Sequence, residues 1–578
     1  MFYPYVSGTF EKSENGNSYA YSAGMDLKMG LTEGFTLDMM LIPDFGQRKS
    51  DYDVLNLSPY ETYYGETRQF FSEGTELFSK AGLFYSRRIG RQPRHYQEVK
   101  DSIKTGETLI DDPDETKLIN AVKVTGRNTN GLGIGFLNAV TENIYATVRR
   151  ADGQVAKILT EPFSNYNIMV ADQSIGKYSY LNFTNTNAVF SNIRRAADVL
   201  GSAFRFADEN NDYAFYGRTA FSYIHDGSEN ETKPGVMLDL GAGKVSGNFR
   251  YSYGVKWYGK QFDINDMGYL SRSNLFEHNL WAKYGVYEPK GNFLNWSVSA
   301  GLHESGLSQP VRYSSTYIDA SFNATFMNYF SVGTWVTAHP LTERDFFEPR
   351  EWGRYSNAGK WFGGSFWYNT DGRKQFSFSN SFDLYHGKYG NTYGASYGLS
   401  YRVNDKFSLY QGTSWSMDQN SFGYVEAINY DTVYFGRRDV PNITVSLSGS
   451  YVFNNTSSLS LDVRHNWTRV DYKDFFFLNP DGSYGAPGSY NPDDKDINYN
   501  TVNVDLTYSW NFAPGSFMTF MWKNKIYSDD TVVDNQFLNV VDNFKHTLNL
   551  PQTNTVSFKV SYYLDYKYLT RLKKLKES

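Results

Sequence analysis

The chain has 578 residues, a formal net charge of −6 and no cysteine. The absence of cysteine excludes disulfides, thiolate metal sites and cysteine nucleophiles, and so small a net charge gives no support to a nucleic-acid partner. The mean hydropathy is −0.54 and no run of 18 or more apolar residues occurs, which excludes transmembrane helices.

Aromatic residues make up 18% of the chain, and they are spread from end to end as 48 Tyr, 43 Phe and 11 Trp. No linker, low-complexity stretch or change of composition interrupts this texture. Uniform composition over such a length favours a single closed architecture in which one pattern of strand, turn and strand repeats.

The chain opens on a strand-like sequence, and residues 1–45 contain three predicted barrel strands at 2–11, 17–30 and 34–45. No signal peptide precedes them. Because a barrel of this kind must be exported, we expect the sequence to be a mature or truncated segment.

Residues 46–117 form a single connection in this scheme, far longer than an ordinary loop. Their apolar content is too high for a free loop, and a wide barrel would otherwise be an open hole. We therefore predict that this segment folds back into the lumen as a constriction or plug.

The segment contains acidic, basic and aromatic side chains that could form a ligand site or a gate inside the barrel. The structural alternative is that carboxylate–guanidinium pairs brace the segment against a polar wall. The candidate residues are Glu61, Tyr63, Tyr64, Glu66, Arg68, Glu73, Glu76, Arg87, Arg88 and Arg91.

Residues 118–567 alternate apolar and polar side chains with a period of two, which is typical of β-strands. In one strand Val502, Val504 and Leu506 oppose Asn503 and Asp505. The predicted strands run for about 11–15 residues, enough for the 9–11 or so that a tilted membrane strand needs. Aromatic residues near strand ends suit an interfacial girdle, and charges in mid-strand suit a wet lumen.

Short turns alternate with long connections along this region, as in bacterial outer-membrane barrels, whose short turns are periplasmic. We count about 23 strands from residue 118 to the end and about 26 in all, with a range of about 24–28. The prediction is thus an all-β fold, a large transmembrane antiparallel barrel with both termini in the periplasm.

Several motifs resemble a known family. They are residues 43–47 (PDFGQ), 84–91 (FYSRRIGR), 125–141 (TGRNTNGLGIGFLNAVT) and 165–173 (NYNIMVADQ). The chain resembles a family of uncharacterised Gram-negative outer-membrane β-barrels, classed as a domain of unknown function. Its members usually carry an N-terminal domain similar to carbohydrate-binding family 9, which this sequence lacks. The resemblance implies an outer-membrane barrel and no known catalytic residue.

Motifs that could carry chemistry are few. Residues 394–398 (GASYG) match a hydrolase nucleophile elbow but lie in an alternating strand, not in a strand–helix turn. The eight histidines show no zinc-site spacing. The acidic clusters at 111–115 and 491–496 could bind calcium or be solvated loops. No metal and no cofactor is predicted.

The last segment, residues 568–578, is a basic tail with leucines at 569, 572 and 575. It could form a short helix on the inner leaflet or contact a partner, or it could simply be a solvated end. We place it in the periplasm.

The leading functional hypothesis is a non-enzymatic outer-membrane protein that passes or gates a solute, including glycan-derived solutes. The alternatives are a barrel subunit of an assembly or secretion complex without conductance and, less favoured, an outer-membrane hydrolase. The expected partners are the lipid bilayer with its lipopolysaccharide, other outer-membrane or periplasmic proteins, and a saccharide ligand.

Overall fold

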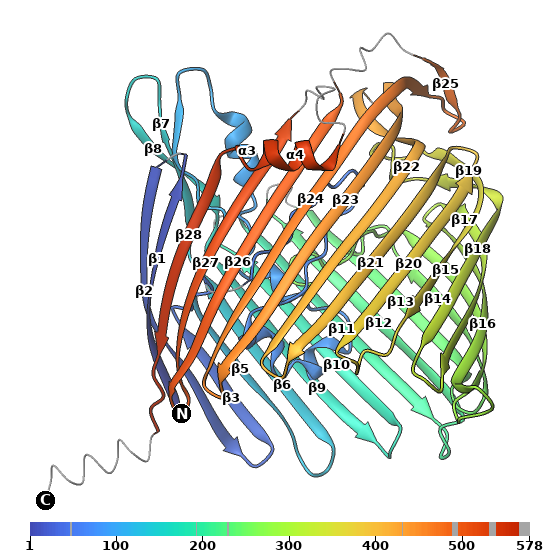
Figure 1. Ribbon diagram of the computed structural model, residues 1–578, viewed down its shortest axis with the longest axis horizontal. Helices are drawn as coiled ribbons and strands as arrows, with labels where there is room; N and C mark the ends of the chain where they lie inside the picture. Colours follow the sequence, from blue (N-terminus) through green and yellow to red (C-terminus); the bar gives the residue numbers. More distant parts are fainter. Residues whose placement is uncertain are drawn as a thin grey trace, which may run out of the picture.

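The computed structural model describes residues 1–14, 16–46, 49–191, 193–227, 231–429, 432–487, 495–530 and 539–565. These residues form an antiparallel β-barrel with loops and short helices at one end (Figure 1). The predicted tail at 568–578 and most of the acidic cluster at 491–496 lie outside the described residues.

The wall of the barrel is one large sheet. Its strands are β1 (Phe2–Ser13), β2 (Gly16–Thr32), β3 (Phe35–Leu41), β5 (Leu118–Arg127), β6 (Leu132–Thr141), β9 (Ser164–Ile175), β10 (Ser179–Phe190), β11 (Arg195–Ala207), β12 (Tyr213–Asp226), β13 (Glu231–Lys244), β14 (Phe249–Tyr258), β15 (Leu275–Val286), β16 (Phe293–Ser308), β17 (Val311–Phe326), β18 (Ser331–Asp345), β19 (Ser356–Asn369), β20 (Phe376–Gly387), β21 (Gly390–Asn404), β22 (Phe407–Asn429), β23 (Thr432–Asn454), β24 (Ser457–Leu478), β25 (Tyr484–Pro487), β26 (Ile497–Ala513), β27 (Ser516–Asp530) and β28 (Gln552–Ser561).

The smaller elements lie in the connections. A separate three-stranded sheet contains β4 (Thr108–Asp111), β7 (Ile144–Arg149) and β8 (Val155–Glu161). The helices are α1 (Gln69–Ser72), α2 (Glu76–Ser79), the 3-10 helix η1 (Ser86–Arg88), α3 (Tyr96–Ser102) and α4 (Val540–Thr547). None of the described helices is long and apolar enough to cross a membrane.

The ring closes where the first strand meets the last. β1 pairs antiparallel with β28, from Tyr5 opposite Ser561 to Lys12 opposite Asn554. Of the 25 strands that the structure describes in this sheet, β25 pairs only with the end of β24, and the other 24 form the closed ring. At this seam β1 and β28 are each hydrogen-bonded to a neighbouring strand on either side, so neither has a free edge there.

Among the described residues the ring has 24 strands, which is two fewer than the best value of about 26 and lies within the predicted range of about 24–28. β7 and β8 lie between the wall strands β6 and β9 in the sequence but outside the ring. The ladder between β6 and β9 ends at Thr141 opposite Ser164, and β7 and β8 pair beyond it with each other and with β4. Pro162 lies at this break and has no N–H to continue the ladder. The 118–567 segment is therefore not composed of wall strands alone.

The two ends of the barrel differ. At one end, here called the short-turn end, the connections are brief, as at Asn404–Phe407 and Asn454–Ser457. The start of β1 lies at this end, beside Leu564 (Figure 1). At the other, the long-loop end, lie the three-stranded sheet, α3 and α4. The three N-terminal strands fall where the sequence pattern predicted them, although β3 stops at Leu41.

Exposure alternates along each strand in the sense opposite to that of a soluble sheet. In β10, Phe183 and Val189 are exposed, whereas Asn182, Thr184 and Thr186 on the other face are buried. An apolar outer face and a polar inner face are what a lipid-facing wall around a polar lumen requires. The barrel is therefore a membrane-spanning one.

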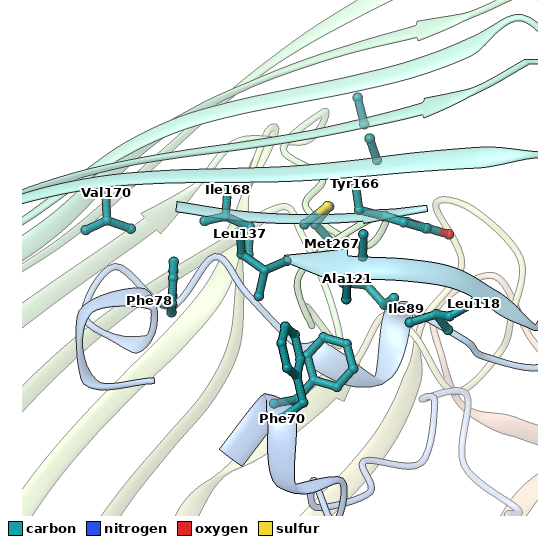
Figure 2. Close-up of a cluster of buried hydrophobic side chains, with 14 of the residues drawn as sticks. Phe70, Phe78, Ile89, Leu118, Ala121, Leu137, Tyr166, Ile168, Val170 and Met267 are labelled. Carbon is teal, nitrogen blue, oxygen red and sulfur yellow. The ribbon is translucent and has the colours of Figure 1, made fainter. Parts of the chain in front are cut away.

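The connection between β3 and β5 packs against the inner face of the wall. Phe70 of α1 and Phe78 of α2 belong to a buried cluster with Leu137 of β6, and with Ile168 and Val170 of β9 (Figure 2). Phe78 is completely buried. Burial of large side chains of this kind contributes roughly 1.5–3 kcal/mol each, so the segment is attached to this side of the wall by apolar packing.

The seam provides a test of the fold. Val6 lies directly opposite Val560 in the β1–β28 register, and the chain has no native cysteine. We expect the double variant Val6→Cys with Val560→Cys to form an intramolecular disulfide on oxidation. A non-reducing gel of the boiled protein would show the altered mobility of a looped chain.

The matched control is Val6→Cys with Phe558→Cys, which is two residues out of register and should cross-link much less because diagonal Cβ atoms lie about 7–8 Å apart. Equal or better cross-linking of the control pair would contradict the register.

Candidate functional site

The segment that leaves the wall begins with a strained residue. Ile42, directly after β3, has a φ of 51°, a conformation that a β-branched residue rarely adopts. The Tyr5 hydroxyl donates a hydrogen bond to the Ile42 carbonyl, and Pro43 follows with no N–H for a strand ladder. The chain therefore turns out of the sheet here, and residues 46–117, called the insert below, begin immediately afterwards.

The first contacts of the insert are with the last strands of the ring. Lys49 forms an ion pair with Asp462 of β24 at 2.6 Å. The backbone N–H and the hydroxyl of Ser50 donate to Asp505 of β26 at 2.8 and 2.9 Å. Because Asp462 and Asp505 face each other across the β24–β26 ladder, one short stretch of the insert neutralises one wall carboxylate and hydrogen-bonds the carboxylate beside it.

The centre of the insert is organised by Arg68, which is only 4% exposed. Its guanidinium donates two bonds to Glu66, at 2.9 and 2.7 Å, and others to the carbonyls of Ile89 and Ser86 at 2.7 and 2.8 Å. The cation also lies 4.3 Å from the ring centroid of Phe71. This buried charge has partners on all sides, as burial of a charge requires.

Burial alone would raise the pKa of Glu66, but hydrogen bonds and charge from Arg68, with a further bond from Ser86, hold this pKa below its usual range. The carboxylate is therefore ionised at neutral pH and acts as a structural anion inside the insert. It is not poised to take up a proton in a reaction.

A second arginine connects the insert to the loop between β14 and β15. Arg88 makes a bidentate pair with Glu61, both bonds being 2.7 Å, and donates to the Gly268 carbonyl at 2.8 Å and to Asn265 at 3.2 Å. The planar fork of arginine suits this geometry. Because this loop joins the wall strands β14 and β15, the Arg88 contacts fix the insert to the barrel.

The two candidate tyrosines belong to a ring cluster. Tyr63 stacks on Tyr85 with centroids 4.8 Å apart and meets Tyr269 edge-on at 5.0 Å. The N–H of Tyr64 donates to the Tyr85 hydroxyl at 2.9 Å, and that hydroxyl donates back to the Tyr64 carbonyl at 2.8 Å. Tyr63 is 60% exposed, which leaves one aromatic face of this cluster open.

The remaining acidic candidates lie near α1 and α2. Glu73 pairs with Lys28 of β2 at 2.9 Å. Glu76 is 3.8 Å from Lys80, whose ammonium also binds Asp172 of β9 at 2.9 Å. The Asp172 side chain is completely buried, so this contact ties α2 to the wall through a desolvated carboxylate.

Arg87 and Arg91 complete the predicted set. Arg87 pairs with Asp51 within the insert. Arg91 has a buried Nε without a hydrogen-bond partner among the described residues, and its pKa is lowered mainly by burial.

The ten predicted residues thus form several separate pairs and clusters, not one convergent site, and this arrangement favours the bracing interpretation. No group of three or more histidine, aspartate and glutamate residues in the described chain is placed to hold a metal. The wall partners Lys28, Asp172, Asp462 and Asp505 are not among the residues predicted from the sequence. Their signal was the presence of charges in mid-strand on the polar face.

Two cavities flank the insert. One, of about 460 Å³, lies between Lys49 and the inner face of β20–β24, and its lining is rich in Ser, Lys and Arg side chains. The other, of about 630 Å³, lies between α1 and strands β1–β3 and β26–β28. The insert therefore does not fill all of the space enclosed by these strands.

The Asp172 contact generates a prediction about stability. In the Asp172→Asn variant both Lys80 and Arg127 of β5 lose their buried anionic partner, and we expect the free energy of unfolding to fall by about 3 kcal/mol. Guanidinium titration of the protein in lipid vesicles, followed by tryptophan fluorescence, measures this change. Glu209→Gln in the exposed β11–β12 turn is the control, and an equal effect of the two substitutions would rule out the assigned role.

Glu66 generates a prediction about pH. A carboxyl whose pKa is lowered in the folded state stabilises that state at pH values above its ordinary pKa of about 4.3. This contribution is lost as the pH falls through the lowered pKa. We expect pepsin to cleave the wild-type insert only toward the acid end of a series from about pH 5 downward. In Glu66→Gln the insert should be cleaved throughout the series. Identical profiles would contradict the account.

Comparison with solved structures finds barrels of low similarity. The siderophore receptor PirA from Pseudomonas aeruginosa has a TM-score of 0.39 and 8% identity, over 78% of this chain and 88% of that one. The ferric preacinetobactin receptor BauA from Acinetobacter baumannii has a TM-score of 0.37 and 8% identity, over 97% and 81%. The outer membrane channel DcaP of Acinetobacter baumannii has a TM-score of 0.26 and 9% identity, over 69% and 97%.

No curated protein matches the sequence significantly. A family model, described as a domain of unknown function (DUF5916), matches residues 1–573. This is nearly the whole chain, wall and insert together, in agreement with the resemblance seen in the sequence motifs. The chain belongs to the DUF5916 family.

Proposed function

We propose that the chain is a non-enzymatic outer-membrane transporter whose insert is a lumenal plug that controls the passage of a solute. Closed single-chain barrels with an even number of strands, short turns at one end and long loops at the other are typical of the bacterial outer membrane. By the same rule the short-turn end and both termini lie in the periplasm.

The observation that carries the proposal is that the insert is bonded to distant parts of the ring. Lys49 binds Asp462 on β24, and Lys80 binds Asp172 on β9. In the ring, the strands β26, β27, β28, β1, β2, β3, β5 and β6 separate β24 from β9. A segment tied at both places crosses the lumen, which supports an occluding role.

The contacts of the insert with the wall differ in strength, which suits a plug that can move. The side chain of Lys49 is 59% exposed, and ion pairs with an exposed partner contribute only about 0–1 kcal/mol each. The apolar packing of α1 and α2 against β6 and β9 is stronger. We infer that the Lys49 side releases first, while the α2 side remains attached as a hinge.

The cavity beside Lys49 indicates the route. Its lining includes Lys49, Lys374, Arg402 and Asp462, together with many serines of β20–β24. Displacement of the Lys49 stretch would widen this polar space toward the short-turn end. Such a passage suits a hydrophilic solute.

Single-channel recording in planar bilayers tests this proposal. The wild-type channel should be mostly closed, whereas Asp462→Lys, which repels Lys49, should open more often and to a higher conductance. The matched control is the charge swap Lys49→Asp with Asp462→Lys, which restores an attractive pair and should restore the closed state.

A wild-type protein that already conducts as a wide open pore would overturn the plug. A conductance that is the same in all three proteins would also overturn it.

A further inference from the structure

The wall is incomplete on its long-loop side next to β2. β2 pairs with β1 along its whole length, from Phe2 opposite Leu27 to Ser13 opposite Gly16. On its other side it pairs with β3 only from Met25 onward. Among the described residues, the stretch Gly16–Gly24 of β2 therefore has a strand neighbour on one side only.

The cause is the early end of β3 at Ile42 and Pro43, where the chain turns toward the lumen. On the long-loop side the separate sheet of β4, β7 and β8 continues from the wall, because β7 follows β6 in the chain and β8 precedes β9. Within the described chain β4 pairs with β7 alone. The gap thus lies between the unpaired half of β2 and β4, in the line that a longer β3 would have occupied.

The unpaired edge lies at the depth of the lipid-facing surface. The ladder rows place Tyr21 beside Gly8 and Phe558, and Ala23 beside Val6 and Val560. Phe558 is an exposed outer-face residue. At this depth an open strand edge is tolerated only where it is buried in protein or lines a water-filled space. Residues 16–21 and 23 of β2 are exposed and so are not buried in protein, and we infer that water reaches the edge of β2 through the gap.

The two sides of the gap differ in chemistry. On the outer side, Tyr19 is 64% exposed, Tyr21 is 84% exposed and Ile42 is 56% exposed. On the inner side, the residues of β1 and β2 are small or polar, as at Thr9 and Ser22. An occupant that matches both sides has a hydrocarbon part directed to the membrane and a polar part directed to the lumen.

The space below the gap fits the polar part of such an occupant. The 630 Å³ cavity is lined by Tyr5, whose hydroxyl holds Ile42 at the floor of the gap. It also contains charged side chains of both signs from the wall and the start of the insert. They are Asp26, Lys28, Asp38, Asp44, Lys123 and Lys559.

We propose that the gap between β2 and β4 is a lateral opening through which an amphipathic molecule with a hydrocarbon chain moves between the lumen and the outer leaflet. The inference rests on the proposed transport function and names its substrate class. The strained Ile42 maintains the opening, because β3 ends there and the following chain turns inward without pairing with the rest of β2.

Cysteine labelling tests whether the gap is wet. In the cysteine-free chain, Ala23→Cys places a thiol on the outer face at the unpaired edge. Its matched control, Val6→Cys, lies directly opposite in the same row on a strand paired on both sides. In proteoliposomes, a charged maleimide should label Ala23→Cys at least about tenfold faster, because a reactive thiolate forms in water and not in hydrocarbon. Equally slow labelling would overturn the opening.

Photolabelling tests the occupant. A diazirine-bearing palmitic acid in the vesicles should form more adducts at Tyr19, Tyr21 and Ile42 than at Phe558, which faces lipid on the fully paired seam. A bulky maleimide attached at Ala23→Cys should suppress this excess. Adducts spread evenly around the barrel would overturn the proposal.

The same proteoliposomes separate this inference from the proposed function. Even labelling together with a conductance that still depends on the Lys49–Asp462 pair would reject the lateral opening and leave the plug intact. Concentrated labelling without any dependence on that pair would reject the plug as the gate.

Discussion

The structure depends on one constraint: backbone N–H and C=O groups that face hydrocarbon must be hydrogen-bonded within the protein. A sheet can meet this only by closing, and β1 meets β28 to do so. Every ring strand is therefore committed to two neighbours. Part of β2 lacks its second neighbour, as do residues 231–236 of β13 and 311–317 of β17. The unpaired part of β2 coincides with the strained exit of the insert at Ile42.

The same constraint explains the unusual interior. Because the outer face takes the apolar side chains, the inner face must be polar, and it carries carboxylates such as Asp172, Asp462 and Asp505. These groups are costly to bury without partners. The insert supplies the partners through Lys49, Ser50 and Lys80. The plug and the wall thus stabilise each other, strongly on the apolar α2 side and weakly on the Lys49 side.

The sequence predicted local features well. Strand alternation depends on neighbouring residues, so it located β1, β2 and most wall strands, and residues 394–398 do lie within strand β21. Pairing between distant strands leaves no such local signal. For this reason the sequence pattern alone does not show that β7 and β8 lie outside the ring. The insert's charged residues were found from composition, but composition does not show which of them pair, as Arg68 does with Glu66 and Arg88 with Glu61.

A disulfide between the insert and the wall gives the most direct test of the plug. Ser50 and Asp505 are in hydrogen-bond contact, and the native chain has no thiol. In Ser50→Cys with Asp505→Cys, oxidation should lock the insert and abolish channel openings, and reduction during the same bilayer recording should restore them. Openings that continue unchanged in the oxidised protein would contradict the account, because the solute path would then not depend on the insert.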